Sequence, residues 1–198
     1  MMKLMLQLAG AFCAAALLAA PVAHAETITV SGVKIEDTLD LKGSKLLLNG
    51  AGIRYRGPFK VYTAGLYLTK KAGSPEDVYA TPGARRMSIT MLRDIDSGEL
   101  GKLFIRGVED NMEKQAFSKL IPGLMRMSQL FTDIKKLNSG DNFTIDWVPG
   151  TGTIITVRGV QHGDAYKEPE FYNALMRIWL GPNPADWKLK DALLGKAG

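Results

Sequence analysis

The chain has 198 residues, of which 46% are hydrophobic and 23% are charged, and its formal net charge is +5. This composition excludes a disordered chain, and the length suits one domain with a substantial core. The basic excess is small and interleaved with acidic residues, so nucleic acid is not an expected partner.

Residues 1–25 have the pattern of a secretory signal peptide. Lys3 supplies a positive charge, the run from Leu8 to Val22 is apolar and rich in alanine, and Ala23-His24-Ala25 is a small-x-small cleavage site. The alternative is an uncleaved anchor helix, but the apolar run is shorter than the roughly 20 residues that a span needs. We therefore expect cleavage after Ala25, location in the periplasm, and a mature domain at 26–198 that does not span a membrane.

The expected signal peptide also contains the only cysteine, Cys13. The mature chain would form no disulfide, so packing alone must stabilise it even in an oxidising compartment. Removing Lys3 lowers the net charge from +5 to +4.

The period-2 pattern predicts seven strand-like runs. They are Thr27 to Val30, Lys45 to Leu48, Ile53 to Arg56, Phe59 to Leu68, Arg86 to Leu92, Phe143 to Val148 and Thr153 to Val160. Asn49-Gly50 is a hairpin signal between the second and third runs, and Pro149-Gly150-Thr151-Gly152 is another between the last two. Antiparallel pairing is expected.

Four helices are predicted between and after these runs. Asp96 and Glu99 have capping-box spacing before an apolar stripe that reaches Met112. A second stripe runs from Leu120 to Ile134, with Pro122 and Gly123 as a start or kink, and a third helix runs from Pro169 to Gly181. A short helix follows Asn183-Pro184 and ends at Gly195. The order of elements predicts an α+β fold with helices on one face of an antiparallel sheet.

Catalytic motifs are scarce in this sequence. His162 is the only histidine after the signal peptide, and one histidine without cysteine cannot build a zinc site. The sequence has no Gly-x-Ser-x-Gly elbow, phosphate-binding loop or dinucleotide fingerprint. We expect neither a metal nor a cofactor, and His162 to be a loop residue.

One stretch places polar residues on successive strands. Arg54 belongs to the run after Asn49-Gly50, and Thr63 lies in the next run beside Gly65. Alternation puts Phe59, Val61, Thr63, Gly65 and Tyr67 on one face of their strand. An arginine that points into such surroundings needs a partner. The alternative is that Arg54 and Arg56 are surface charges on an edge strand and Thr63 is only a good strand former.

The motif Gly50-Ala51-Gly52-x-Arg54, followed by Phe59-x-x-Tyr62-Thr63-Ala64-x-x-Tyr67-Leu68, resembles the chalcone isomerase family. The resemblance continues through Arg93-Asp94-Ile95, Ser97-Gly98, Ile105-Arg106-Gly107, and Leu180-Gly181 to Leu194. The amino-acid sequence of the last segment is more similar to an exported bacterial chalcone isomerase-like branch than to the plant enzymes. The resemblance implies one domain at 26–198, an open-faced sandwich with a ligand cleft between a large antiparallel sheet and a layer of helices.

In the plant enzymes the motif arginine holds the substrate oxyanion and the motif threonine hydrogen-bonds around the ketone, which implies these roles for Arg54 and Thr63. The enzymes also use a tyrosine, an asparagine and a hydroxyl on their helices. Those positions fall near Phe117 or Ser118, near Met125 and at Ile178. Three polar groups are thus replaced, mostly by apolar ones, and little isomerase activity is expected.

The leading hypothesis is a non-catalytic periplasmic protein that binds a fatty-acid-like or aromatic carboxylate in this cleft. Arg54 and Thr63 would be polar anchors, Phe117 and Ile178 apolar walls, and Tyr62 or Tyr67 could donate a second hydrogen bond. One alternative is an isomerase or intramolecular lyase that acts on a chalcone-like enone through Arg54 and Thr63. A second alternative is an envelope protein-interaction module with a filled core and no cleft.

Overall fold

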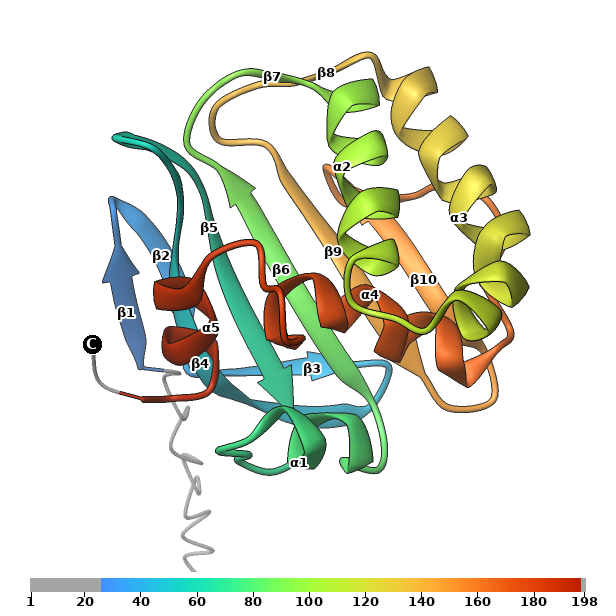
Figure 1. Cartoon of the computed structure of the whole chain (residues 1–198). Coiled ribbons are helices and arrows are strands. Elements are labelled where there is room, and N and C mark those ends of the chain that lie inside the picture. Colours follow the sequence, from blue (N-terminus) through green and yellow to red (C-terminus); the bar gives the residue numbers. More distant parts are fainter. Residues whose placement is uncertain (1–25, 197–198) are drawn as a thin grey trace, which may run out of the picture.

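The computed structural model describes residues 26–196, and Figure 1 shows its arrangement. The expected signal peptide lies outside the described residues. The strands are β1 (Thr27–Val30), β2 (Val33–Glu36), β3 (Thr38–Leu41), β4 (Ser44–Arg56), β5 (Phe59–Leu68), β6 (Arg85–Met91), β7 (Ile95–Asp96), β8 (Lys136–Leu137), β9 (Asn142–Val148), β10 (Gly152–Val157) and β11 (Val160–Gln161). The helices are α1 (Pro75–Ala80), α2 (Ser97–Glu109), α3 (Lys114–Ile134), α4 (Pro169–Leu180) and α5 (Trp187–Leu193).

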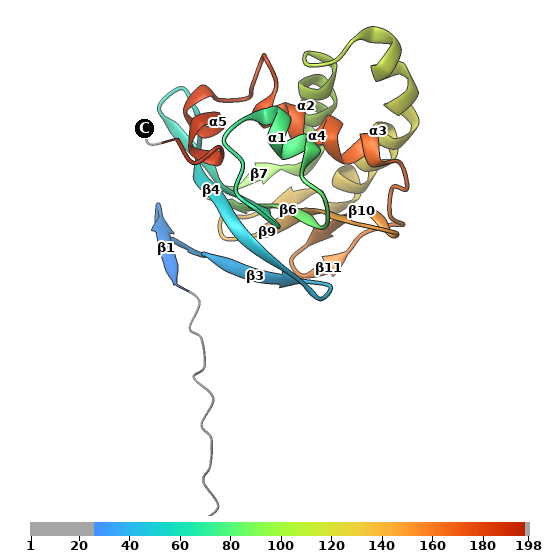
Figure 2. The same ribbon diagram turned by 90° about the horizontal axis from the view of Figure 1, so that it is seen from below.

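Seven strands form the main sheet in the order β11-β10-β9-β6-β5-β4-β3, and every neighbouring pair is antiparallel. The predicted turn at 149–152 joins β9 to β10 and is confirmed. The α+β class predicted from the order of elements is confirmed as well, because a large antiparallel sheet carries the helices on one face (Figure 2).

The main core lies between this sheet and the helices. Phe104 of α2 contacts Phe131 of α3 and Trp179 of α4 edge to face, with ring centroids 5.6 Å apart in both pairs. Phe131 in turn lies 5.5 Å from Phe143 of β9. Phe131, Phe143 and Trp179 are fully buried. These contacts join three helices to the centre of the sheet, and aromatic pairs of this geometry stabilise a fold by about 0.5–1.5 kcal/mol beyond the area that they bury.

The opposite face of the sheet is partly covered by the N-terminal strands. β1 and β2 form a two-stranded antiparallel sheet, and Ile35 of β2 packs with Leu46 and Leu48 of β4 and with Tyr67 of β5 in a second, smaller cluster. Figure 2 shows β1 on the side of the main sheet away from the helices, near β3 at the edge of that sheet. The periodicity analysis missed β2 and β3.

The hairpin expected at Asn49-Gly50 is wrong, because β4 continues through it as one strand of 13 residues. The pairing with β5 shifts by one residue between Leu48 and Gly50, so Asn49 forms a bulge instead of a turn. Its side chain accepts from Ala72 N at 2.7 Å and donates to the carbonyl oxygens of Ala72 and Leu193 at 2.9 and 2.7 Å. These long-range partners stabilise the bulge, and a turn signal of short range cannot reveal them.

The helices lie close to where the patterns place them. Asp96 caps α2 by accepting from Glu99 N at 2.9 Å, as its spacing predicts, but the helix ends at Glu109 and not at Met112. α3 begins at Lys114, so Pro122 lies inside the helix and does not start it. α1 was not predicted from periodicity because it is only six residues long. No helix within residues 26–196 is long and apolar enough to cross a bilayer.

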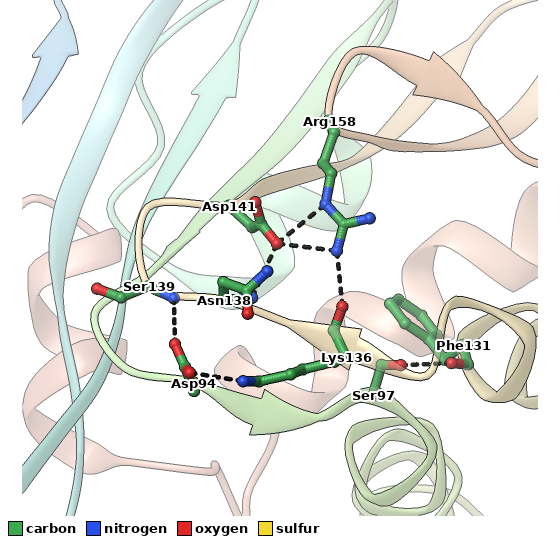
Figure 3. Close-up of polar contacts among 8 residues, drawn as sticks. All are labelled: Asp94, Ser97, Phe131, Lys136, Asn138, Ser139, Asp141 and Arg158. Atoms are coloured by element: carbon green, nitrogen blue, oxygen red, sulfur yellow. Dashed lines mark hydrogen bonds and ion pairs between the residues drawn. The ribbon is translucent and has the colours of Figure 1, made fainter.

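A polar network fixes the end of the molecule where α2 begins and α3 ends (Figure 3). β7 and β8 pair there, and Lys136 binds Asp94 at 2.7 Å. Asp141 accepts from Arg158 at 2.9 Å, and Arg158 also donates to the Lys136 carbonyl oxygen at 2.6 Å. The network therefore holds the start of α2 against the sheet, and α2 forms one wall of the cavity described next.

Candidate functional site

A cavity of about 570 Å³ opens between α2, the adjoining ends of β4 and β5, and the loop that joins α4 to α5. Apolar side chains form most of its wall: Phe59, Val61, Leu100, Leu103, Phe104, Ile178, Pro184 and Ala185. The sheet side of the cavity contributes Arg54 and Tyr62, which are paired across β4 and β5 and so lie side by side on the helix-covered face. The cavity thus has an apolar wall, two polar groups on its sheet side and further charged side chains at its rim.

Arg54 is held in place by two neighbours. Its guanidinium donates to the carbonyl oxygen of Tyr55 and lies 3.6 Å from a carboxylate oxygen of Asp186, which is longer than a hydrogen bond. Asp186 is itself engaged, because it accepts from Tyr55 N at 2.9 Å and caps α5 by accepting from Lys188 N and Leu189 N. A guanidinium has five N–H donors, so Arg54 retains donors for a further acceptor.

Tyr62 is the second polar group in the cavity wall. Its hydroxyl accepts from the Trp179 indole N–H at 2.9 Å, and among the described residues it donates to none. Burial raises the pKa of Tyr62 to about 12, although the Trp179 hydrogen bond and the charge of Arg54 act in the opposite direction. The phenol is therefore neutral at physiological pH and can donate its proton in a hydrogen bond to an anion beside Arg54.

Further charges lie at the rim of the cavity, and most of the acidic ones are neutralised by neighbours. Asp94 pairs with Lys136, Glu99 with Lys102, and Asp110 with Arg106. The hydrogen bond from Lys136 lowers the pKa of Asp94, so this carboxylate is a poor proton acceptor. The acidic groups at the rim are consequently engaged in pairing and capping.

The structure does not bring Thr63 and Tyr67 together with Arg54. Thr63 is buried on the opposite face of the sheet, where it lines a separate pocket of about 200 Å³ under β2 and makes a long 3.5 Å contact to the Thr90 carbonyl oxygen. Tyr67 lines the same pocket and donates to the Glu36 carbonyl oxygen at 2.9 Å. Of the four polar residues singled out from the sequence, only Arg54 and Tyr62 share the cavity.

The predicted apolar wall residues are also divided. Ile178 of α4 lines the cavity and is buried. Phe117 lies on α3, is half-buried against the main core and does not line the cavity. Ser118 and Met125, the other positions implied on that helix, are exposed. The alternative placement on an edge strand agrees with the local pairing, because β3 pairs only with residues 44–47 and the part of β4 that carries Arg54 and Arg56 pairs with β5 alone. Arg56 is an exposed charge, as that alternative expects, whereas Arg54 is partly buried.

The sequence predicts helix α2 but does not identify it as the wall of the cavity that faces the sheet. Leu100, Leu103 and Phe104 of α2 line the cavity, together with Asn183, Pro184 and Ala185 of the α4–α5 loop. The apolar stripe of α2 can be recognised in the sequence. The stripe does not reveal that one of its members, Leu103, is 49% exposed at the cavity and not buried in the core. The loop carries no comparable signal. Among residues 26–196, no three histidine, cysteine, aspartate or glutamate residues stand close enough to hold a metal ion.

A helix-covered antiparallel sheet with an apolar cavity that ends at a guanidinium and a phenol defines an α+β sandwich with a site of ligand size. The chain belongs to the chalcone isomerase-like family, which matches residues 27–195. The fold is similar to a crystal structure of a fatty-acid binding protein from Arabidopsis thaliana, with a TM-score of 0.66 and 16% identity over 85% of this chain and 96% of that chain. A comparison with curated protein sequences finds no significant match.

Proposed function

We propose that this chain is a non-catalytic binding protein for a fatty-acid-like or aromatic carboxylate, exported to the periplasm after cleavage at Ala25. The observation that carries the proposal is the cavity, in which Arg54 and Tyr62 converge beside a wall of aliphatic and aromatic side chains. Its volume of about 570 Å³ falls in the range typical of small-molecule sites. The structural neighbour is a fatty-acid binding protein, and this supports the same ligand class.

The two polar groups suit a carboxylate headgroup. Arg54 can form a charge-assisted hydrogen bond to one oxygen, and the neutral Tyr62 hydroxyl can donate to the other. The hydrocarbon part of the ligand would lie against Phe104, Leu100 and Ile178, where apolar contact replaces water. A site with two polar donors beside an apolar wall suits an amphiphile with one negatively charged end.

An isomerase or intramolecular lyase fits the site less well. General base catalysis needs a group whose pKa lies near the working pH. Tyr62, with a pKa raised to about 12, remains protonated, and Asp94 is held as an ion pair. The alternative of a module with a filled core does not account for a cavity of this size.

The test begins with native mass spectrometry of the protein purified from the periplasm, followed by extraction and identification of the bound molecule. We expect a co-purifying fatty acid or related carboxylate. Arg54→Ala removes a charge-assisted hydrogen bond of about 1.5–3 kcal/mol and should weaken binding by roughly 10- to 100-fold. An empty wild-type protein that cyclises a chalcone would instead favour the isomerase.

A second pair of variants tests whether Tyr62, inferred from the structure, or Thr63, implied by the resemblance, binds the carboxylate together with Arg54. Tyr62→Phe should weaken carboxylate binding by roughly 2- to 10-fold, because one hydrogen bond is lost. Thr63→Val, one residue away but on the other face, should leave the affinity for that carboxylate unchanged. The affinities are measured by isothermal titration calorimetry, with circular dichroism as the check on folding. The opposite ranking of the two variants would return Thr63 to the site and contradict the pairing of Arg54 with Tyr62.

A further inference from the structure

The rim of the cavity combines exposed apolar side chains with unpaired cations. Phe59 and Leu103 both line the cavity, yet they are 59% and 49% exposed. Phe59 follows the two-residue turn Gly57–Pro58 that joins β4 to β5, and the Arg93 guanidinium lies 5.2 Å from the centre of its ring. Phe59 and Leu103 therefore present apolar surface to solvent at the entrance of the cavity, beside a cation.

The charges at this rim do not cancel. Within residues 26–196, Arg56 and Arg93 form no ion pair, and both are exposed. The acidic residues Asp94, Glu99 and Asp110 are each paired with another cation. Asp96 is the one rim carboxylate engaged only as a helix cap. Two unpaired cations against one carboxylate give a local positive excess beside Phe59.

These residues lie on neighbouring segments at one end of the molecule. Arg56 ends β4 and Phe59 begins β5 on either side of the β4–β5 turn, Arg93 lies in the link between β6 and β7, and Leu103 lies on α2. Figure 1 shows the turn, the β6–β7 link and α2 in the upper part of the view. We call Arg56, Phe59, Arg93 and Leu103 the rim patch. All four members line the cavity, so a surface that covers the patch would also face the cavity entrance.

We propose that the rim patch docks on a lipid bilayer that carries anionic headgroups, and that the cavity exchanges its ligand with this bilayer. The patch has the two features of an interfacial anchor, aromatic and aliphatic side chains that enter the headgroup region and cations that attract anionic lipid. A carboxylate amphiphile partitions into membranes. A protein that binds it can therefore take up or release the ligand directly when its cavity entrance lies against the bilayer. The inference rests on the proposed ligand class but predicts a separate event, because docking needs no ligand.

The experiment is vesicle co-sedimentation of the chain that begins at Glu26, which contains every described helix and strand. Vesicles of phosphatidylcholine with 30% phosphatidylglycerol are compared with pure phosphatidylcholine at about 0.05 and 0.5 M salt. We expect binding to the anionic vesicles, and its loss at high salt through screening. Each cation near the surface is worth about fivefold in partition coefficient. The double variant Arg56→Gln/Arg93→Gln should therefore reduce binding by roughly 25-fold, and Phe59→Ser should reduce it further.

Matched controls remove the same charge and the same kind of apolar group elsewhere. Lys45→Gln/Lys167→Gln takes away two exposed cations that form no ion pair within residues 26–196, and Val160→Ser removes a side chain that is 61% exposed. If these variants reduce binding as much as the rim variants do, attraction by net charge is the explanation and the proposal is wrong. Absence of vesicle binding by the wild type, or self-association through the rim patch in sedimentation velocity, would also overturn it.

The proposed function and this inference fail separately. Arg54→Ala should lose carboxylate binding in solution but still sediment with anionic vesicles. If the wild type binds the carboxylate in solution and does not sediment with vesicles, the binding function stands and docking falls. If it sediments without binding any carboxylate, docking stands, exchange of a carboxylate falls, and the proposed function must be revised.

Discussion

At the residue scale, a single irregularity in strand pairing decides which residues form the site. Arg56 pairs with Phe59 and Tyr55 with Lys60, and a regular continuation would set Arg54 opposite Val61. A register shift between Arg54 and Tyr55 sets Arg54 opposite Tyr62 instead. Because side chains alternate between the two faces of a strand, a shift of one residue changes the face that a partner occupies. The bulge thus unites Arg54 with Tyr62 and leaves Thr63 behind the sheet.

Asp186 sets how strongly Arg54 can bind a ligand. Its carboxylate lies 3.6 Å from the guanidinium and competes with a carboxylate ligand for the same charge. Asp186→Asn removes this competition, and asparagine remains a good helix cap for α5. We expect severalfold tighter carboxylate binding by calorimetry, with a loss of about 1 kcal/mol in the free energy of unfolding from the altered bond to Tyr55 N.

The control for this variant is Asp191→Asn, which makes the same charge change on the same helix at an exposed position 3.9 Å from Lys196. It should leave carboxylate affinity unchanged. Equal affinities of Asp186→Asn and the wild type would mean that Asp186 does not compete with the ligand for Arg54.

At the scale of elements, the approach of α5 to β4 depends on glycine. A Cβ atom on Gly50 would overlap the carbonyl oxygen of Ala192 and lie 2.9 Å from that of Leu193. A Cβ atom on Gly52 would lie 2.7 Å from the Ala192 Cβ. These glycines therefore let the last helix rest on the sheet, and Asp186 at its start reaches Arg54 as a result.

Gly50→Ala should destabilise the protein, because backbone atoms of α5 must move to accept the methyl group. We expect a loss of about 1–3 kcal/mol in the free energy of unfolding, as in other overpacked sites, measured by urea denaturation. Gly73→Ala is the matched control, since a Cβ atom there meets nothing within 4 Å, and it should change stability by less than about 0.5 kcal/mol. Similar losses for both variants would show that the contact with α5 is not responsible.

The network that holds the start of α2 gives stability a dependence on acid pH. The Arg158 hydrogen bond, with one from Asn138 N, lowers the pKa of Asp141 below its ordinary value of 3.8. A carboxyl group with a lowered folded pKa contributes stability above its unfolded pKa, and the contribution is lost as the pH falls through the folded pKa. The contribution of this ion pair should therefore be complete at pH 5–7 and be lost as the pH falls through the lowered folded pKa of Asp141.

The variant Arg158→Gln tests this dependence. Its deficit in the free energy of unfolding relative to the wild type should be largest at pH 5–7 and should close as the pH falls through the folded pKa of Asp141. Arg106→Gln serves as the control, because its pair with Asp110 is long at 3.8 Å and exposed, and its deficit should be small at every pH. A deficit for Arg158→Gln that is independent of pH would assign the effect to the bond with the Lys136 carbonyl oxygen instead.

At the scale of the whole molecule, the described fold begins with β1 at Thr27, two residues after the expected cleavage site. Expression of the complete chain with its own N-terminus should give a periplasmic product whose N-terminal sequence begins at Glu26 and whose intact mass lacks residues 1–25. Cell fractionation with N-terminal sequencing checks this outcome. Recovery of the complete chain in the membrane fraction would support the anchor helix instead.

Local patterns in the sequence were enough for much of this protein. Alternating runs and capping residues predicted β5, β6, β9, α2 and α4. These elements are long enough to show, within their own residues, the repeat of apolar side chains that is typical of a strand or a helix. The antiparallel sheet with one layer of helices followed from their order. Arg54, Tyr62 and Ile178 could also be anticipated as cavity residues, from a motif and from a resemblance.

Contacts between distant segments decided the rest. Asn49 forms a bulge and not a turn because Ala72 and Leu193 supply its hydrogen-bond partners, and Leu193 is 144 residues away. Tyr62 replaces Thr63 beside Arg54 because of a register shift that only paired strands possess. The sequence by itself thus determined which elements form and the layers they build, since these depend on local periodicity. The tertiary structure alone decided which side chains meet in the cavity, since that depends on register and on the approach of α2 and α5.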